Sequence, residues 1–456
     1  MTNPYPPTIA LATLGCKVNQ AETEAITRRF ASAGFLVRSF DALADVYVLN
    51  TCTVTHVADR KARHLLRQAR RRNPNALLVA TGCYATTDPE AIRAIPGVDL
   101  VVPNEQKQDL PALVGARLDC ARAAADASSP GSQRTGPAVR TRAFVKVQDG
   151  CDNFCAYCIV PFARGRPRSV APDQVVAQVQ ALVSAGYQEV VLTGVHLGLY
   201  GRDLPTHACP LTLTSLVRRI LNETQVRRLR LSSIEPQDFA ADLLGLWADG
   251  RLCRHLHLPL QAGADATLQR VGRRYTVATF ADLVARCRTS VPGLAVTTDM
   301  IVGLPGETEV EFRESYDFAR AMGFARIHVF PYSPRQGTRA ASMPNQVPEP
   351  TKRARSQALM HLSEESGRSF TQSFLGQVLE VLWEERLPPA AEDAAPRWAG
   401  LTDNYIRVTA ENPEDMGNRI TPVRLVGLRK DGALGQMEAT WTNRPGYLTS
   451  CASGQG

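Results

Sequence analysis

Three closely spaced cysteines constrain this chain more than any other feature of its sequence. Cys151, Cys155 and Cys158 form a C-x₃-C-x₂-C motif within residues 146–158. Three thiolates this close on a loop suit an iron–sulfur cluster better than a disulfide framework or a tetrahedral zinc site, which usually has two C-x₂-C pairs or histidine partners. A cubane cluster has four irons and normally four thiolate ligands, so three thiolates leave one iron open. The motif therefore predicts a cluster that can bind a small molecule through its open iron.

The residue before the third cysteine narrows this prediction. With the aromatic Tyr157 at that place, the spacing resembles the signature of the radical S-adenosylmethionine enzymes. The resemblance implies a 4Fe–4S cluster on the three cysteines, with the open iron binding the amino and carboxylate groups of S-adenosylmethionine. The alternative, three structural thiols, requires this spacing to arise by chance among 11 cysteines in 456 residues.

Length and charge set the broad class. The 456 residues correspond to about three domains, and the net charge of +8 suits a polyanionic partner such as RNA without requiring one. No apolar stretch approaches the ~20 residues of a membrane-spanning helix, and residues 1–7 lack the basic and apolar regions of a signal peptide. The odd cysteine count and the lack of an export signal favour a reducing compartment. We therefore expect a cytoplasmic protein without a membrane partner.

Strand and helix patterns alternate over residues 8–104, which predicts a doubly wound α/β domain. Asn19 is the expected cap of the first helix, with Glu22 three residues later, and Gly34 its stop. The expected strands are residues 8–14, 46–50, 76–81 and 98–102, and the other expected helices are residues 57–72 and 90–94.

Three further cysteines follow strands of this domain. Cys16, Cys52 and Cys83 come after the first, second and third expected strands. The carboxyl ends of parallel strands share one edge of an open sheet, so these thiols can converge there. Their convergence predicts a second three-cysteine cluster with an open iron. The alternative is that they are small buried residues, as free cysteines often are.

The sequence segments around these cysteines resemble those in the N-terminal domain of the methylthiotransferases. They are residues 14–22, 50–54 and 81–85, and the resemblance extends along nearly the whole chain. It implies that one cluster reductively cleaves S-adenosylmethionine to a 5′-deoxyadenosyl radical, which abstracts a substrate hydrogen. The other cluster then carries a sulfur, which a second S-adenosylmethionine methylates before its delivery. The metal ligands so implied are Cys16, Cys52, Cys83, Cys151, Cys155 and Cys158.

The substrate is inferred from the sequence motif around the first cysteine, Cys16. Residues 14–20, Leu-Gly-Cys-Lys-Val-Asn-Gln, most resemble the branch that methylthiolates threonylcarbamoyladenosine at position 37 of tRNA. The alternatives are isopentenyladenosine in tRNA and an Asp of a ribosomal protein, or, in a different class, a non-catalytic iron–sulfur or electron carrier. The expected partners are the tRNA anticodon loop, a reductant such as flavodoxin or ferredoxin, and a sulfur donor.

The first domain is expected to span residues 6–118, followed by a linker at 119–136 and the radical S-adenosylmethionine core at 137–367. Six alternating strand and helix units predict a partial (β/α)6 barrel, whose chemistry lies on loops at the carboxyl ends of the strands. The expected strands are residues 143–147, 189–193, 228–232, 254–258, 295–300 and 326–330, and expected helices include 172–185, 213–221 and 308–322.

Polar residues end several of these strands. The resemblance implies that these loops hold S-adenosylmethionine, although Glu235 and Gln261 are equally good as structural turn residues. His255, His257 and His328 are expected to lie in the core or to contact the ligand-binding residues, rather than to bind a ligand themselves. The candidate cofactor-binding residues are Tyr157, Thr193, Gly194, Ser233, Glu235, Gln261 and Asp299.

Two basic segments lie near the cysteine motifs. Arg164, Arg166 and Arg168 crowd the loop after Cys158, where they contact either substrate phosphates or the cofactor carboxylate, or form ordinary surface charge. Seven basic residues between 60 and 72 crowd the helix after Cys52 and are either a solvated face or a phosphate-contacting stripe.

The tail predicts a small all-β barrel over residues 370–449, after a helix at 351–368. Residues 400–408 resemble the TRAM domain, an OB-like RNA-binding barrel. Arg407 is a candidate phosphate contact, and Tyr405 either stacks a base or fills the barrel core. The expected strands are residues 376–383, 405–409, 422–428 and 434–440, with an internal loop at 388–398.

Overall fold

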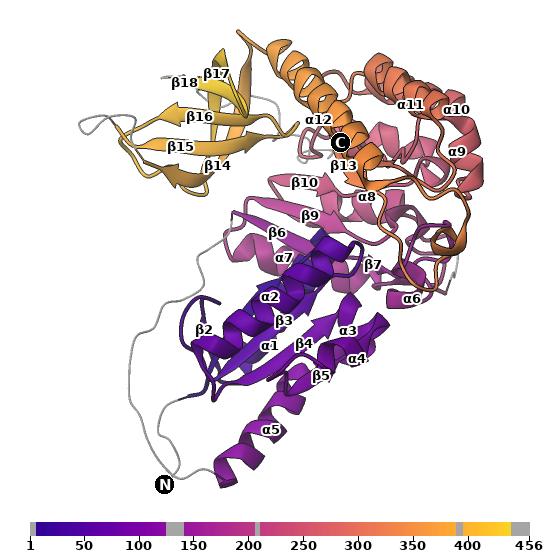
Figure 1. The fold of residues 1–456 in the computed structure, drawn as a ribbon. Helices are drawn as coiled ribbons and strands as arrows, with labels where there is room; N and C mark the ends of the chain where they lie inside the picture. Colours follow the sequence, from indigo (N-terminus) through magenta and orange to yellow (C-terminus); the bar gives the residue numbers. More distant parts are fainter. Residues whose placement is uncertain (1–5, 125–140, 206–209, 389–394, 439–456) are drawn as a thin grey trace.

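The structure is a computed structural model that describes residues 6–124, 141–205, 210–388 and 395–438. It has three parts along the chain: an N-terminal sheet with helices, a central barrel-like domain and a small β-barrel (Figure 1). Cys209 and Cys451 lie outside the described residues. In the described ranges, no helix is both long enough and apolar enough to cross a membrane.

The N-terminal domain is the predicted doubly wound α/β fold. Its five strands pair only in parallel, in the order β2-β1-β3-β4-β5. One apolar cluster packs α1 and α5 on one face of the sheet, and a second packs α2 and α4 on the other. The strands are β1 (Thr8–Thr13), β2 (Leu36–Arg38), β3 (Val46–Thr51), β4 (Leu77–Gly82) and β5 (Leu100–Val102). The helices are α1 (Lys17–Ser32), α2 (His56–Arg72), α3 (Cys83–Thr87), α4 (Pro89–Arg93) and α5 (Leu110–Ala124).

Three details differ from the sequence expectations. Helix α1 starts after Cys16, and Asn19 is not its cap: the buried Asn19 amide donates to the Leu14 carbonyl at 2.7 Å and the Thr51 carbonyl at 3.1 Å. These bonds tie α1 to the ends of β1 and β3. Strand β2 and helix α3 lie outside the predicted elements. Helix α5 extends to Ala124, within the predicted linker, and its first turns pack on the sheet through Leu110 and Val114.

The central domain is a six-stranded open barrel. Its two three-stranded parallel sheets, β6-β9-β10 and β11-β12-β13, join through bridges at Leu229–Leu252 and Ser233–His257. The main strands are β6 (Arg142–Lys146), β9 (Glu189–Thr193), β10 (Arg228–Leu231), β11 (His255–His257), β12 (Ala295–Val302) and β13 (Arg326–Pro331), with a hairpin of β7 (Gln148–Asp149) and β8 (Arg168–Ser169). All six predicted strands are present within a few residues.

Helices cover the outside of this barrel (Figure 1). They are α7 (Pro172–Ser184), α8 (Leu213–Glu223), α10 (Val277–Ser290), α11 (Glu309–Met322) and α12 (Glu349–Gln372). Helix α9 (Asp265–Arg270) follows β11, and α6 (Val160–Arg164) lies against α3 of the N-terminal domain. The 3-10 turns are η1 (Asn104–Asp109), η2 (Leu197–Leu199), η3 (Pro236–Asp238), η4 (Ala241–Ala248) and η5 (Arg339–Ser342). The molecule's largest apolar cluster lies between these helices and the strands.

The C-terminal part is a small β-barrel, as predicted, and it is closed by five strands where four were expected. Its strand order is β14-β15-β16-β18-β17 around buried Trp383, Val408 and Leu425. Strand β15 lies outside the predicted strands and overlaps the end of the expected loop. The strands are β14 (Val378–Leu387), β15 (Arg397–Thr402), β16 (Arg407–Glu411), β17 (Ile420–Arg429) and β18 (Gly432–Met437).

Arginines of the central domain fasten this barrel. Arg228 donates to the carbonyls of Glu380 and Leu401, and Arg254 pairs with Asp403 at 2.6 Å. The small barrel is therefore docked on the strands of the large one.

Candidate active site

Three cysteines lie at one edge of the N-terminal sheet. Cys16 occupies the N-cap position of α1 after β1, Cys52 follows β3 and Cys83 begins α3 after β4, and these three strands are neighbours. We call this set the auxiliary triad. Glycine is required beside it: a Cβ on Gly15, whose φ is 101°, would lie 2.8 Å from the Cys52 Sγ. The sheet thus brings together the three residues that the sequence predicts to converge.

The auxiliary triad consists of three free thiols at the ends of neighbouring strands. All three thiols are free, and burial raises the pKa of Cys52 to about 12, an effect to which the thiols of Cys83 and Cys16 add. Three converging thiols are a soft donor set suited to iron–sulfur clusters, and binding iron deprotonates them.

The second set lies on the loop between β7 and α6. We call Cys151, Cys155 and Cys158 the loop triad. All three thiols are free; burial raises the pKa of Cys151 to about 11 and that of Cys158 to about 12, and neighbouring thiols of the set add to both. This donor set also fits a cluster with one open iron.

Two residues outside the predicted site set lie beside the loop triad, and sequence reasoning gave Arg273 no role. The buried Arg273 places Nη1 3.5 Å from the Cys155 Sγ and also bonds Glu235. His196 places Nδ1 3.9 Å from the Cys151 Sγ, and its Nε2 lies 3.0 Å from Asp238. Burial opposes ionisation of Asp238, but hydrogen bonds and charges from His196 and Arg202 hold its pKa below its ordinary value. Cationic and imidazole groups therefore border the thiols.

The predicted cofactor residues fall into two groups. Tyr157 and Glu235 lie by the loop triad: both interact with Arg273, Tyr157 also with Cys155, and Glu235 also with Cys151. Thr193 is buried at the end of β9, and Gly194 follows it, where a Cβ would lie 3.0 Å from Gln148. Ser233, just after β10, forms a parallel backbone bridge with His257 of β11. Gln261 has a φ of 68°, and its backbone N–H donates to the Asp299 carbonyl.

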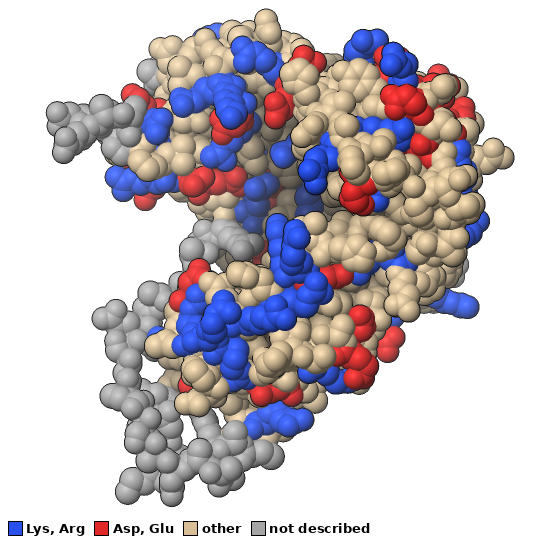
Figure 2. Space-filling view, in the orientation of Figure 1, with Lys and Arg blue, Asp and Glu red and all other residues tan. Residues whose placement is uncertain are grey.

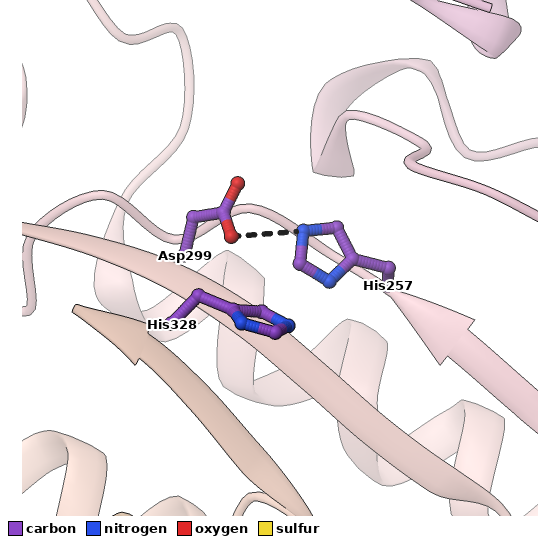
Figure 3. A group of neighbouring side chains, drawn as sticks. All are labelled: His257, Asp299 and His328. Atoms are coloured by element: carbon purple, nitrogen blue, oxygen red, sulfur yellow. Dashed lines mark ion pairs between the residues drawn. The ribbon is translucent and has the colours of Figure 1, made fainter. Parts of the chain in front are cut away.

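Asp299 belongs to a different cluster. Asp299 on β12 faces His257 on β11 and His328 on β13, and their ligand atoms lie within 4.8 Å of one another (Figure 3). His257 Nε2 lies 3.2 Å from Asp299, and its Nδ1 lies 2.9 Å from the Thr297 hydroxyl. Burial lowers the pKa of His328 to about 4, so that imidazole is neutral at pH 7. The histidines expected in the core therefore line a polar group on adjacent strands.

One predicted RNA contact is wrong. The Arg164 side chain is 2% exposed and bonds Glu22 at 3.0 Å and Asp149 at 2.8 Å. The burial of Glu22 is offset by Lys107, Arg164 and Lys146, which together hold its pKa well below its ordinary value. Arg164 therefore joins the N-terminal domain to the central domain, and its guanidinium is too buried to contact a phosphate. Arg166 and Arg168 are exposed.

Tyr405 fits neither of its two sequence interpretations. Its ring stacks on Arg230, whose guanidinium carbon lies 3.8 Å from the ring centroid, and meets the edge of His255 at 4.5 Å. Tyr405 thus packs between the small barrel and the central strands, neither as an open stacking platform nor in the barrel core. Arg407 pairs with Glu385 at 3.3 Å and Asp431 at 3.2 Å.

The basic stripe on α2 is partly available to a polyanion. Three of its arginines are already engaged: Arg63 donates to the Tyr84 hydroxyl, and Arg70 and Arg72 form salt bridges with Asp99 and Asp41, respectively. Figure 2 shows Lys and Arg gathered on the N-terminal domain and around the hollow between it and the small barrel. The exposed members of the stripe are Arg60, Lys61, Arg67 and Arg71.

An open parallel barrel with a three-thiol loop defines the central domain as a radical S-adenosylmethionine domain. The family model described as the Radical SAM superfamily matches residues 145–319. The model described as uncharacterized protein family UPF0004 matches residues 8–103, which hold the auxiliary triad. Among solved structures, the radical S-adenosylmethionine methyltransferase TsrM from Kitasatospora setae shares the fold, with a TM-score of 0.53 over 72% of this chain and 75% of that one at 17% identity.

Full-length relatives define the family. The chain is 42% identical to threonylcarbamoyladenosine tRNA methylthiotransferase MtaB of Bacillus subtilis (strain 168), over 92% of this chain and 94% of that protein. It is 34% identical to the protein of that name from Aquifex aeolicus (strain VF5), over 90% and 98% of the two chains. It is 32% identical to tRNA-2-methylthio-N(6)-dimethylallyladenosine synthase of Akkermansia muciniphila, over 92% and 96%. The chain belongs to the radical S-adenosylmethionine tRNA methylthiotransferase family.

Proposed function

We propose that this enzyme converts threonylcarbamoyladenosine at position 37 of tRNA to its 2-methylthio derivative. The observation that carries this proposal is the 42% identity, over nearly the full length of both chains, to a threonylcarbamoyladenosine tRNA methylthiotransferase. Identity to the dimethylallyladenosine synthases of the same family is lower, at 32% and 34%. The sequence motif around Cys16, residues 14–20, supports the same branch of the family.

The proposed cofactors are two 4Fe–4S clusters and S-adenosylmethionine. The auxiliary triad would hold one cluster within residues 6–118, and the loop triad the other within residues 137–367. When bound, these groups supply the radical cleavage of S-adenosylmethionine, the sulfur and the methyl group, which acid–base side chains cannot supply at a C–H bond. Candidate cofactor contacts remain Tyr157, Thr193, Gly194, Ser233, Glu235, Gln261 and Asp299.

The protein's own groups have positioning roles in this proposal. Arg273 lies against both Cys155 and Glu235, so it fixes the loop triad and offsets negative charge there. The network of Glu22, Lys146, Asp149 and Arg164 locks the N-terminal domain onto the central domain. The two triads are thereby held in one fixed relation.

We also propose the surfaces that meet the partners. The exposed arginines and lysine of α2, together with Arg166 and Arg168, would contact tRNA phosphates, and residues 370–449 would contribute further RNA contacts. A reductant such as flavodoxin or ferredoxin and a sulfur donor are required by the chemistry. A tRNA substrate and oxygen-sensitive clusters favour a cytoplasmic enzyme.

The test is nucleoside mass spectrometry of tRNA from cells with and without this protein. The 2-methylthio form of threonylcarbamoyladenosine is expected only when the protein is present. If only the isopentenyl nucleoside gains a methylthio group, the substrate assignment is wrong. If tRNA is unchanged and an Asp of a ribosomal protein is modified instead, the tRNA assignment falls.

A further inference from the structure

One lysine of the N-terminal domain reaches the place where all three domains meet. Lys17 is the first residue of α1 and follows Cys16 of the auxiliary triad. Its Nζ lies 5.8 Å from the ring centroid of Tyr405, which belongs to the small barrel. The Lys17 charge also acts on His255 and Asp299 of the central strands. Lys17 therefore lies between Cys16 of the auxiliary triad, Tyr405 of the small barrel and the central strands that carry His255 and Asp299.

The other cations around Tyr405 are neutralised by carboxylates. Arg230 pairs with Glu189 at 2.6 Å, and Arg142 pairs with Glu384 at 2.5 Å. Asp299, the acid on which Lys17 acts, is held by His257 at 3.2 Å. Over the residues that the structure describes, no carboxylate oxygen lies within 4.0 Å of the Lys17 Nζ, although the side chain is half-buried. A half-buried ammonium without a salt-bridge partner favours an anionic ligand.

We propose that Lys17 binds the carboxylate of the threonyl group of the substrate nucleoside and so determines substrate choice. The inference rests on the proposed function and names the group that the site reads. A threonylcarbamoyl substituent carries one carboxylate, whereas an isopentenyl substituent is apolar and carries none. Because Lys17 follows Cys16 directly, an anchored carboxylate fixes the modified adenosine beside the auxiliary triad. An ammonium is a compact point charge, so it can hold a carboxylate without the paired geometry that an arginine imposes.

The test is the binding of three anticodon stem-loop RNAs to the reconstituted full-length protein. One carries threonylcarbamoyladenosine, one its neutral methyl ester and one unmodified adenosine. We expect the wild-type protein to bind the acid at least about tenfold more tightly than the ester, as for a charge-assisted hydrogen bond. Lys17→Met should abolish this ratio, and Lys17→Arg should restore part of it. As a control, Lys61→Met on the exposed face of α2 should weaken all three RNAs alike.

Two results overturn the proposal. Equal wild-type affinity for acid and ester shows that the carboxylate is not read, and this result needs no variant. Equal weakening of all three RNAs by Lys17→Met assigns Lys17 to a phosphate instead. Retained S-adenosylmethionine cleavage with dithionite verifies that the variant is folded. Failure of the proposed function has a different signature, because the wild-type protein would then form no 2-methylthio product from the acid.

Discussion

The two cysteine triads have the same ligand set but are built in opposite ways. The loop triad comes from eight consecutive residues, 151–158, so any fold that presents this loop presents all three thiols. The auxiliary triad comes from the ends of three strands, at Cys16, Cys52 and Cys83, and exists only when the sheet pairs β1, β3 and β4 correctly. The loop triad is local chemistry, whereas the auxiliary triad depends on tertiary structure. Perturbing the N-terminal domain should therefore separate their activities.

The largest expected effect comes from removing one thiol of each triad. Cys151→Ala should abolish both 5′-deoxyadenosine formation and methylthio transfer. Cys52→Ala should abolish methylthio transfer while 5′-deoxyadenosine still forms, because the loop triad is intact. Each variant should lose about four irons per chain. The measurements are iron analysis and chromatography of both products after anaerobic reconstitution.

Cys287→Ala is the matched control, because Cys287 is buried yet outside both triads. It should keep its iron and both products. Loss of iron and of 5′-deoxyadenosine in Cys52→Ala would show that the two sites are not independent.

Glycine substitution should damage the auxiliary triad alone. Gly15→Ala forces a Cβ to within 2.8 Å of the Cys52 Sγ at φ 101°. A displacement of about 1 Å in a reacting group costs on the order of 100-fold in rate, so methylthio product should fall by at least about tenfold. Liquid chromatography with mass spectrometry should show unchanged 5′-deoxyadenosine formation.

Gly34→Ala supplies the comparison, since Gly34 has φ 88° with nothing within 4 Å of the added Cβ. It carries the backbone strain without the steric clash. Equal losses of product in Gly15→Ala and Gly34→Ala would mean that strain in the backbone flanking α1, rather than contact with Cys52, is responsible.

The interface between the domains should be sensitive to Glu22. Glu22→Gln leaves Lys107, Lys146 and Arg164 around a neutral side chain, and breaking a buried ion network costs roughly 3–5 kcal/mol. Because the folded-state pKa of Glu22 is held well below its ordinary value, its contribution is present above about pH 4.3 and is lost as pH falls through the folded pKa. Denaturant unfolding at several pH values measures both effects.

Glu22→Gln should accordingly show a weaker loss of stability in acid than the wild-type protein. Glu90→Gln, which breaks an exposed pair with Arg93, should change stability little. An unchanged unfolding free energy in Glu22→Gln would contradict the role of this network.

The smallest expected effect is a difference in thiol reactivity in cluster-free protein. Burial raises the pKa of Cys52 and of Cys158 to about 12, so few of these thiols are ionised at pH 8, while Cys16 is exposed. Iodoacetamide should modify Cys16 before Cys52 and Cys158, as followed by peptide mass spectrometry. Equal rates at all six thiols would mean that the triads are not formed before the clusters bind.

Much of the fold was predictable because its strands are short apolar runs with clear stops. Strand β9 matches its expected residues, and the six central strands appear where the pattern placed them. Strand β2 was missed because it has only three residues, and Asn19 looked like a helix cap although it is a buried tie between α1 and two strands. A side chain that can cap a helix can equally bond a neighbouring strand, and local sequence does not distinguish the two.

The site was predictable only where its parts are local. The loop triad was evident from spacing, whereas Arg164 looked exposed because Glu22, its partner, lies 142 residues away. Arg273 carried no motif. The group of His257, Asp299 and His328 had a usable signal, since polar residues on three consecutive strands of a parallel barrel can face one another. Tyr405 could not be placed without the docking of the small barrel.

The most direct test of the central claim is a reaction in vitro. Reconstituted protein, S-adenosylmethionine, dithionite and tRNA carrying threonylcarbamoyladenosine are incubated without oxygen, and nucleosides and 5′-deoxyadenosine are measured together. We predict formation of the 2-methylthio form of threonylcarbamoyladenosine along with 5′-deoxyadenosine. Formation of 5′-deoxyadenosine without this nucleoside, while a parallel reaction with isopentenyladenosine tRNA yields a 2-methylthio nucleoside, would contradict the account.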